Sequence, residues 1–249
     1  MDCLYTRRHL ESKVVTQFQR ACLRMAMLLF SACVPVCAQS VQFLPEIDPH
    51  LKVNSFLRAY LEAKDDQDAG ASKQLGIGPS LQFYLKPLLK LKNFTAFDLD
   101  DSKARPLVLE TGYRYIAAPD APSTNRNLTM LTFHFPLMAG FIISDRNRVD
   151  LDWKSGEFTW RYRNKLTLER TFTVRSCHLI PYVAAEPHYG SQYSKWSTTA
   201  LYAGCLFPLG KYVQFNSYYE HENNSGKSPN QQKNGFGLAL YLFFSLEKK

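Results

Sequence analysis

The sequence predicts an all-β protein: a single antiparallel transmembrane-type β-barrel of about twelve strands, with ten as the alternative. Three observations carry this prediction, namely strict alternation of apolar and polar residues, the length of the alternating segments, and the order of long and short links. The chain has 249 residues, 45% of them hydrophobic and 14% aromatic. It contains no apolar run of 18 residues, which excludes a bundle of membrane-spanning helices. Its 17 Phe and 14 Tyr exclude a disordered chain.

Residues 1–38 are predicted to be a cleaved secretory signal. A basic start is followed by an apolar run from Met25, and Ala38 ends a group of small residues typical of a cleavage site. Two alternatives remain open: translation that starts at Met25, and lipoprotein processing at Cys33. The barrel domain is expected to span residues 39–249, and its destination is the cell outer membrane.

Charge excludes one class of partner. Without residues 1–38, which hold five basic and two acidic residues, 25 Lys or Arg remain against 20 Asp or Glu, a net charge of +5. These residues form no basic run that could follow a phosphate backbone, so nucleic-acid binding is not expected. The two remaining cysteines, Cys177 and Cys205, are not expected at opposed positions, which disfavours a disulfide.

Alternation is clearest in residues 75–86. One parity reads Leu, Ile, Pro, Leu, Phe, Leu, and the other reads Gly, Gly, Ser, Gln, Tyr, Lys. A helix does not produce a period of two, so this segment is a predicted strand. The same pattern recurs in residues 158–169 and 235–244. The glycines of these segments alternate within strands and leave room for neighbouring side chains, so they are not phosphate loops.

Nine further segments complete the expected barrel. They are residues 46–53, 57–64, 91–97, 107–116, 127–135, 141–153, 179–188, 198–207 and 212–222. Most of the expected strands exceed the mean of about five or six residues in soluble proteins. Their length suits a tilted crossing of an outer membrane.

The links give an independent check, because membrane barrels alternate long outer loops with short inner turns. If the last strand descends to the periplasm, the long links 117–126, 189–197 and 223–234 fall on the outer side, and the short links 136–140 and 208–211 on the inner. An even strand number follows.

Some links oppose this assignment. Residues 154–157 are short for an outer loop, while 65–73 and 98–106 are long for inner turns. The chain also continues beyond Phe244, whereas such barrels usually end on the final aromatic residue.

The polar parity of the hairpin 141–170 would face the lumen and form a charge ladder. Its members are Arg146, Arg148, Asp150, Asp152, Arg161, Arg163, Lys165 and Glu169. A turn centred on Ser155 and Gly156 places Asp150 opposite Arg161 and Arg148 opposite Arg163.

Opposed arginines need further carboxylates, for which Glu186, Glu220 and Glu222 are candidates. Two interpretations stay open. The ladder is either a salt-bridged packing that holds a narrow barrel together, or a basic constriction that binds or admits small anionic solutes.

Aromatic residues favour a membrane. Trp153, Phe158, Trp160 and Tyr162 gather at one hairpin tip, as an interfacial belt requires. The alternative is a soluble periplasmic β-barrel or sandwich that binds an apolar ligand, in which the apolar parity would point inward.

The sequence offers few candidate catalytic residues. A barrel-embedded lipid hydrolase would need a serine and a base. His134, His178, His188 and His221 are available as bases, and Ser191 and Ser194 lie near His188. This group lacks a hydrolase signature, so no enzymatic activity is expected. No Cys or His pair has metal-ligand spacing, and neither a metal nor a cofactor is expected.

Several stretches resemble a known family. Residues 158–166 (Phe-Thr-Trp-Arg-Tyr-Arg-Asn-Lys-Leu), Asp145-Arg146-Asn147-Arg148, Gly112-Tyr113-Arg114-Tyr115 and Pro181-Tyr182 resemble the bacterial barrel family catalogued as domain of unknown function 2490. The resemblance extends from about residue 41 to Phe244. It implies an outer-membrane-type barrel and no known activity. Such a protein would have outer-membrane lipid and, during insertion, the barrel-assembly machinery as partners, while its oligomeric state stays open.

Overall fold

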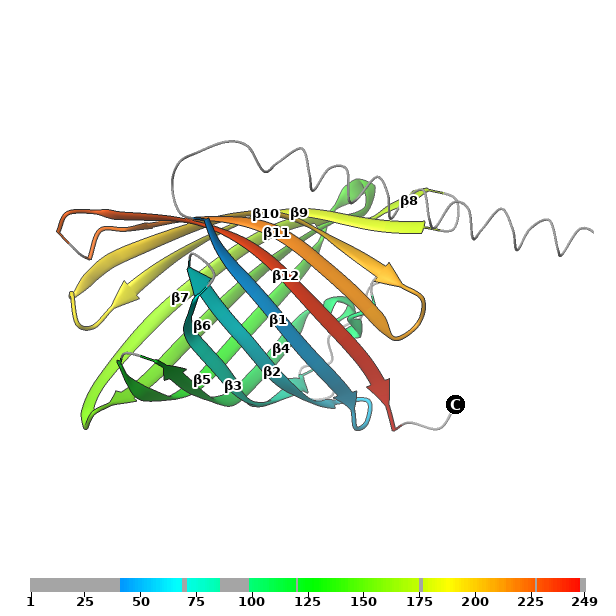
Figure 1. Ribbon diagram of the computed structural model, residues 1–249. Coiled ribbons are helices and arrows are strands. Elements are labelled where there is room, and N and C mark those ends of the chain that lie inside the picture. Colours follow the sequence, from blue (N-terminus) through cyan, green and yellow to red (C-terminus); the bar gives the residue numbers. More distant parts are fainter. Residues whose placement is uncertain are drawn as a thin grey trace, which may run out of the picture. The chain divides into compact units, whose positions relative to one another are not determined.

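A closed ring of strands dominates the structure, a computed structural model that describes residues 41–68, 71–85, 99–119, 121–174, 177–226 and 228–246 (Figure 1). Its elements are β1 (Val41–Lys52), β2 (Leu57–Asp68), β3 (Ala71–Tyr84), the 3-10 helix η1 (Asp101–Ala104), β4 (Leu107–Ala118), β5 (Ala121–Pro136), the 3-10 turn η2 (Met138–Gly140), β6 (Phe141–Lys154), β7 (Glu157–Arg170), β8 (Phe172–Val174), β9 (Cys177–Gly190), β10 (Lys195–Leu209), β11 (Val213–Asn224) and β12 (Gln231–Ser245). The predicted all-β barrel is therefore confirmed. Within the described ranges, no helix is long and apolar enough to cross a membrane.

Eleven strands close the ring, and β8 is a short twelfth strand that pairs only with β9. Neighbours in the ring are antiparallel except at one seam. There β1 and β12 run in parallel, from the pair Val41–Asn234 to the pair Lys52–Ser245. Figure 1 shows these two strands, blue and red, side by side with their arrowheads in the same direction.

The odd ring differs from the expected even number. The segment 91–97, expected as a strand, lies outside the described residues, and β3 pairs directly with β4, for example through Leu81 and Thr111. Without a strand between them, β1 to β3 run opposite to their expected directions. The link between β2 and β3 consequently lies at the end where β6 turns into β7, here named the hairpin end. The link between β3 and β4 lies at the other end, where β12 finishes, here named the C-terminal end.

Several expected loops are continuations of strands. β4 runs to Ala118 and β5 begins at Ala121, so the expected long link 117–126 is a tight connection. β2 and β3 similarly extend through most of residues 65–73. The prediction followed apolar residues, whereas backbone pairing continues after the side chains become polar.

The wall is apolar outside and polar inside. Val183 and Leu201 point outward and are 55% and 51% exposed. The most deeply buried side chains include the charged residues Arg58, Asp150 and Glu186, at 2% exposure or less. All three are ion-paired, as charged residues usually are when they are buried inside a protein.

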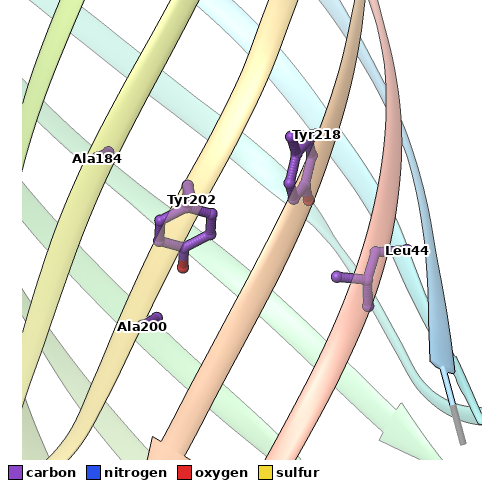
Figure 2. Packing of buried hydrophobic residues seen from close by; sticks show 5 residues of the cluster. All are labelled: Leu44, Ala184, Ala200, Tyr202 and Tyr218. Atoms are coloured by element: carbon purple, nitrogen blue, oxygen red, sulfur yellow. The ribbon is translucent and has the colours of Figure 1, made fainter. Parts of the chain in front are cut away.

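Part of the lumen is filled by a small cluster on β1 and β9–β11 (Figure 2). It consists of Leu44, Ala184, Ala200, Tyr202 and Tyr218. The ring centroids of Tyr202 and Tyr218 are 6.1 Å apart. A Cβ at Gly237 would lie 2.0 Å from Cζ of Tyr218, so the glycine makes room for this ring, as predicted for the strand glycines.

Candidate solute site in the barrel lumen

A cavity of about 510 Å³ occupies the lumen toward the hairpin end. Its lining includes Gln42 and Gln74 near the first residues of β1 and β3, and Asn224 at the last residue of β11, so it reaches the rim of the barrel at that end. This volume lies within the range of ligand pockets. The walls are polar, unlike the mostly apolar lining of common drug-like sites.

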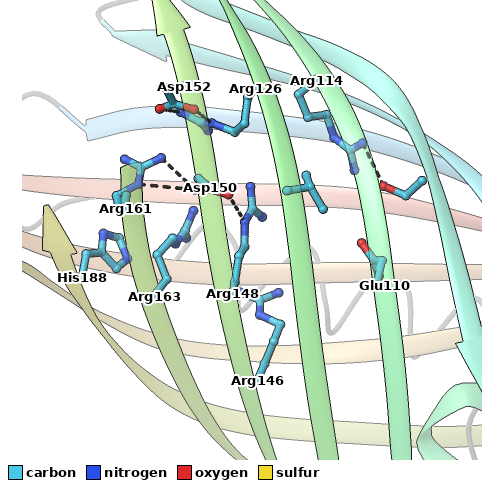
Figure 3. A network of polar contacts seen from close by, with 12 residues as sticks. Glu110, Arg114, Arg126, Arg146, Arg148, Asp150, Asp152, Arg161, Arg163 and His188 are labelled. Carbon is cyan, nitrogen blue, oxygen red and sulfur yellow. Dashed lines mark hydrogen bonds and ion pairs between the residues drawn. The ribbon is translucent and has the colours of Figure 1, made fainter. Parts of the chain in front are cut away.

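The predicted register of the charge ladder is confirmed. Arg148 pairs with Arg163 across β6 and β7, and Asp150 pairs with Arg161. Figure 3 shows the arginines of β4 to β7 pointing into the lumen. Each arginine of the ladder forms an ion pair with a carboxylate, but there are fewer carboxylates than arginines.

Two buried carboxylates each serve two arginines. Asp150 accepts from Arg148 Nε at 2.5 Å and from Arg161 Nη2 at 3.0 Å. Glu186 Oε1 accepts from Arg163 Nε at 2.9 Å and from Arg146 Nη2 at 3.1 Å. Glu186, on β9, is thus the further carboxylate that the opposed arginines were expected to need. Each group of three carries a net positive charge.

The extra positive charge faces the cavity. Of the two arginines on Asp150, Arg148 is 11% exposed and Arg161 is 33% exposed. Of the two on Glu186, Arg163 is 18% exposed and Arg146 is 31% exposed. Nε of Arg146 has no hydrogen-bond partner among the described residues. These two guanidinium groups retain donors that an anion could accept from.

Another pair is internally neutral. Arg126 binds Asp152 through two parallel hydrogen bonds of 2.6 and 2.9 Å, a bidentate geometry that uses the carboxylate fully. Asp152 is a predicted ladder residue, whereas Arg126, on β5, was not identified from the sequence.

Lys165 takes a different role in the ladder. Its Nζ lies 3.7 Å from the centroid of the Tyr202 ring, a cation–π contact. The hydroxyl of Tyr202 lies 3.0 Å from Glu186 and 3.1 Å from Glu220. Tyr202 therefore connects the basic side of the lumen to a carboxylate on β11.

Glu169 does not belong with the other ladder residues. It lies on the same inward parity of β7 but near the C-terminal end, where its Oε2 accepts from Lys103 Nζ at 2.8 Å. Parity alone placed it correctly on the inner face. Parity could not show that Glu169 lies beyond the cavity, in contact with the link between β3 and β4.

Residues 100–103 of that link contact β2 and β7 from inside the ring at the C-terminal end. Arg58, on β2, forms ion pairs with both Asp100 and Asp101. Lys52 and the hydroxyl of Tyr84 also contact Asp101, at 3.3 and 3.0 Å. The helix η1 is thus held inside the ring, whereas the sequence indicated only a long turn.

Electrostatics keep Asp100 ionised in this link. Burial would raise the pKa of Asp100, but the Arg58 guanidinium and a hydrogen bond from the Ser102 amide hold it well below its usual range. The ion pair consequently persists at neutral and mildly acidic pH.

Sequence reasoning also missed a second charged side of the cavity. Glu46, Glu62 and Asp66 on β1 and β2 line it, as does Arg114 on β4. Arg114 Nη2 donates to Glu62 at 2.7 Å. Inward parity in residues 57–64 was visible in the sequence, but nothing showed that this face lies across the lumen from β6 and β7.

Among the described residues, no hydrogen bond joins His188 to Ser191 or Ser194. His188 points into the lumen, with Nε2 4.0 Å from Glu186 Oε1, while Ser191 Oγ accepts from the amide of Trp160 at 2.9 Å. Across the ranges that the structure covers, no group of three His, Cys, Asp or Glu side chains is arranged to hold a metal ion.

A scan of the chain against protein-family models finds no match, and a search of curated proteins finds none either. The resemblance to domain of unknown function 2490 therefore stays a prediction.

Proposed function

We propose that the protein is an outer-membrane β-barrel whose lumenal cavity binds small solutes that carry an anionic group. The observation that carries the proposal is the reversal of polarity in a closed barrel, with apolar residues outward and ion-paired residues inward. A membrane lipid phase is the environment that would cover such an outer face.

Aromatic residues at both rims support a membrane position. Trp153, Phe158, Trp160 and Trp196 are exposed near the hairpin end, and Phe135, Tyr212 and Phe244 near the C-terminal end. Interfacial belts of this kind anchor membrane barrels at the headgroups. Outer-membrane lipid and the barrel-assembly machinery are the proposed partners. A soluble periplasmic barrel would need the opposite orientation of its apolar parity.

The solute part rests on the two shared carboxylates. Arg146 and Arg161 are the cations in excess, and both line the cavity. A carboxylate or phosphate there would accept charge-assisted hydrogen bonds without displacing the buried pairs of Arg148 and Arg163.

The membrane part is tested by heat-modifiability. Membrane fractions from expressing cells are compared on gels with and without boiling. A boiling-dependent mobility shift of membrane-borne protein is expected, because a closed barrel resists detergent until heated. Soluble recovery without a shift would contradict the proposal.

The solute part is tested by calorimetric titration of the purified protein in detergent micelles with butyrate. The double variant Arg146→Met/Arg161→Met should weaken binding about tenfold or more, the loss of about 1.4 kcal/mol. Lys154→Met is the matched control, since Lys154 is exposed at the β6–β7 tip, outside the cavity. Equal affinity for the double variant and the control would refute the anion site.

A further inference from the structure

Polar side chains interrupt the apolar outer face of β6 and β7. On these strands Val149 and Leu166 point outward and are 38% and 51% exposed. Because side chains alternate along a strand, Asp145, Asn147 and Asn164 share this outward face. The cavity lining contains none of the three. They are here named the outer polar cluster, and the solute site leaves them without a role.

The outer polar cluster lies midway between the two aromatic rims. Asn147 and Asn164 pair directly across β6 and β7. Trp160, at the hairpin end, pairs four residues further along β6 in one direction, and Phe135, at the C-terminal end, four residues away in the other. At about 3.3 Å per residue, each rim is about 13 Å away along the strand. In a barrel whose rims lie at the headgroups, this is the middle of the hydrocarbon layer.

Apolar side chains stand beside the cluster at the same depth. On β5, Leu131 pairs with Asn147, and Phe133 pairs with Asp145. On β7, Leu166 pairs with Asp145. Hydrocarbon offers no hydrogen bonds, so polar side chains in this layer usually face protein or water and mark a functional surface.

Hydrogen bonds within the cluster fix how its two amides are oriented. Asn164 Nδ2 donates to Asp145 Oδ1 at 2.6 Å and to Asn147 Oδ1 at 3.1 Å. The Tyr162 hydroxyl also donates to Asn147 Oδ1. Among the described residues, Asn147 Nδ2 donates no hydrogen bond and Asn164 Oδ1 accepts none. One amide donor and one amide acceptor therefore remain on the outer face, and each costs free energy in lipid.

These two groups match each other when the face meets a copy of itself. A two-fold axis along the membrane normal keeps every residue at its own depth. Asn147 and Asn164 lie at similar depth because they are a cross-strand pair. Asn147 of each copy can then donate to Asn164 of the other. A lipid or an unrelated protein would need to carry a matching donor and acceptor, whereas a second copy necessarily carries both.

We propose that the outer face of β6 and β7 is the contact surface of a homodimer in the membrane, with the outer polar cluster at its centre. The partner is a second copy of this chain, related by a two-fold axis. The inference rests on the proposed outer-membrane position and is independent of the solute site.

Site-specific photo-cross-linking tests which molecule covers this face. The photoreactive residue p-benzoylphenylalanine replaces either Val149, beside the cluster, or Ile47, which is 42% exposed on β1 at the opposite side of the ring. Irradiated membranes should yield a product of twice the monomer mass from position 149 and none from position 47. Absence of this product, a product of another mass, or equal yields at the two positions would overturn the inference.

Substitutions test the contribution of the two amides. In sedimentation equilibrium in detergent micelles, the unsubstituted protein should be a dimer. The double variant Asn147→Leu/Asn164→Leu should raise the dissociation constant of the dimer about tenfold or more, because both reciprocal hydrogen bonds are lost. Ser217→Leu, a polar-to-leucine change on the outer face of β11, is the matched control and should leave it unchanged. Equal dissociation constants for the double variant and the unsubstituted protein would contradict the proposed contact.

The boiling-dependent gel shift separates this inference from the proposed function. A monomer in membranes and micelles, with an intact gel shift, overturns the dimer and leaves the membrane barrel standing. Soluble recovery of the unsubstituted protein without a shift rejects both. Each variant is first shown to keep the shift, so that lost association is not mistaken for a lost fold.

Discussion

Gly78 lies where β3 and β4 come closest together. Backbone pairing is interrupted between the pairs Ile77–Tyr115 and Ser80–Gly112 and resumes in the same register. Here Arg114 Nη1 donates to the carbonyl oxygens of Gly78 and Pro79 at 3.0 and 3.2 Å. The guanidinium thus donates to carbonyl oxygens where the backbone pairing is interrupted, and a buried arginine becomes part of the wall.

Gly78→Ala should destabilise the barrel by about 1–3 kcal/mol, the usual cost of forcing a methyl group into a packed site. The added Cβ would lie 2.0 Å from the carbonyl oxygen of Tyr113, a backbone atom that cannot rotate away. Gly76→Ala is the control, because its nearest neighbour would be 3.8 Å away. Urea unfolding followed by tryptophan fluorescence measures both, and similar losses would contradict this account.

The two arginines beside each shared carboxylate should differ in their effect on stability. Arg163→Met leaves Glu186 with Arg146 as its only arginine and should lower the free energy of unfolding by about 1–3 kcal/mol. Arg161→Met leaves Asp150 with Arg148, and since Arg161 is one-third exposed, the loss should be below about 1 kcal/mol. The same urea titrations report both values. A larger loss for Arg161→Met would show that the ladder serves packing alone.

Among the elements, the described part of the link that contains η1 is tied to several strands of the ring. It contacts β1 through Lys52, β2 through Arg58, β3 through Tyr84 and β7 through Glu169. These contacts come from strands around the ring, so the link is fixed across the lumen and does not hang from one wall. The cavity is consequently expected to admit solutes from the hairpin end without forming a through-channel.

Arg58→Met should open the C-terminal end, because it removes the ion pairs that hold Asp100 and Asp101. In planar lipid bilayers the unsubstituted protein should show little ion current, and the variant should show a steady increase. Lys154→Met again serves as the control. Unchanged current in Arg58→Met would mean that other residues block the lumen.

The closed state should tolerate mild acid. A carboxyl whose pKa is lowered by folding stabilises the fold above its unfolded value, about pH 4, and this contribution is lost only as the pH falls through the lowered value. For Asp100 that loss lies below pH 4. Currents of the unsubstituted protein should therefore be the same at pH 7 and pH 5, and an increase at pH 5 would contradict the assigned role of this pair.

At the scale of the whole molecule, the barrel reverses the usual distribution of polarity, and one substitution tests what surrounds it. Val183 points outward near the middle of β9 and is 55% exposed. In a bilayer, Val183→Arg should destabilise the barrel by about 2–4 kcal/mol, because the charge would enter hydrocarbon. Tyr212→Arg, in the turn at the C-terminal end, should cost only about 0–1 kcal/mol.

Urea titrations in lipid vesicles measure both variants. A soluble barrel would tolerate the two changes equally, since both positions would face water. Equal stability of Val183→Arg and Tyr212→Arg would therefore contradict a membrane position.

Alternation and turn spacing along the chain are enough to establish the fold class, the faces of the strands and the local register. A period of two requires strands, and a two-residue turn at Ser155 and Gly156 fixes every partner along β6 and β7, including Asp150 with Arg161. These are local relations, set by neighbours in the chain. For the same reason, strand parity alone places Arg146, Arg148, Arg163 and Lys165 on the inner face.

The closure of the ring, and the residues that face each other across it, depend on contacts that form only in the folded barrel. The parallel seam of β1 with β12 and the contact of Glu169 with Lys103 join residues far apart in the sequence. Alternation carries no information about contacts between distant strands, because the pattern of a strand is the same whichever strand lies beside it. The cavity and its mixed lining of basic and acidic side chains are consequently a property of ring closure, and no single strand encodes them.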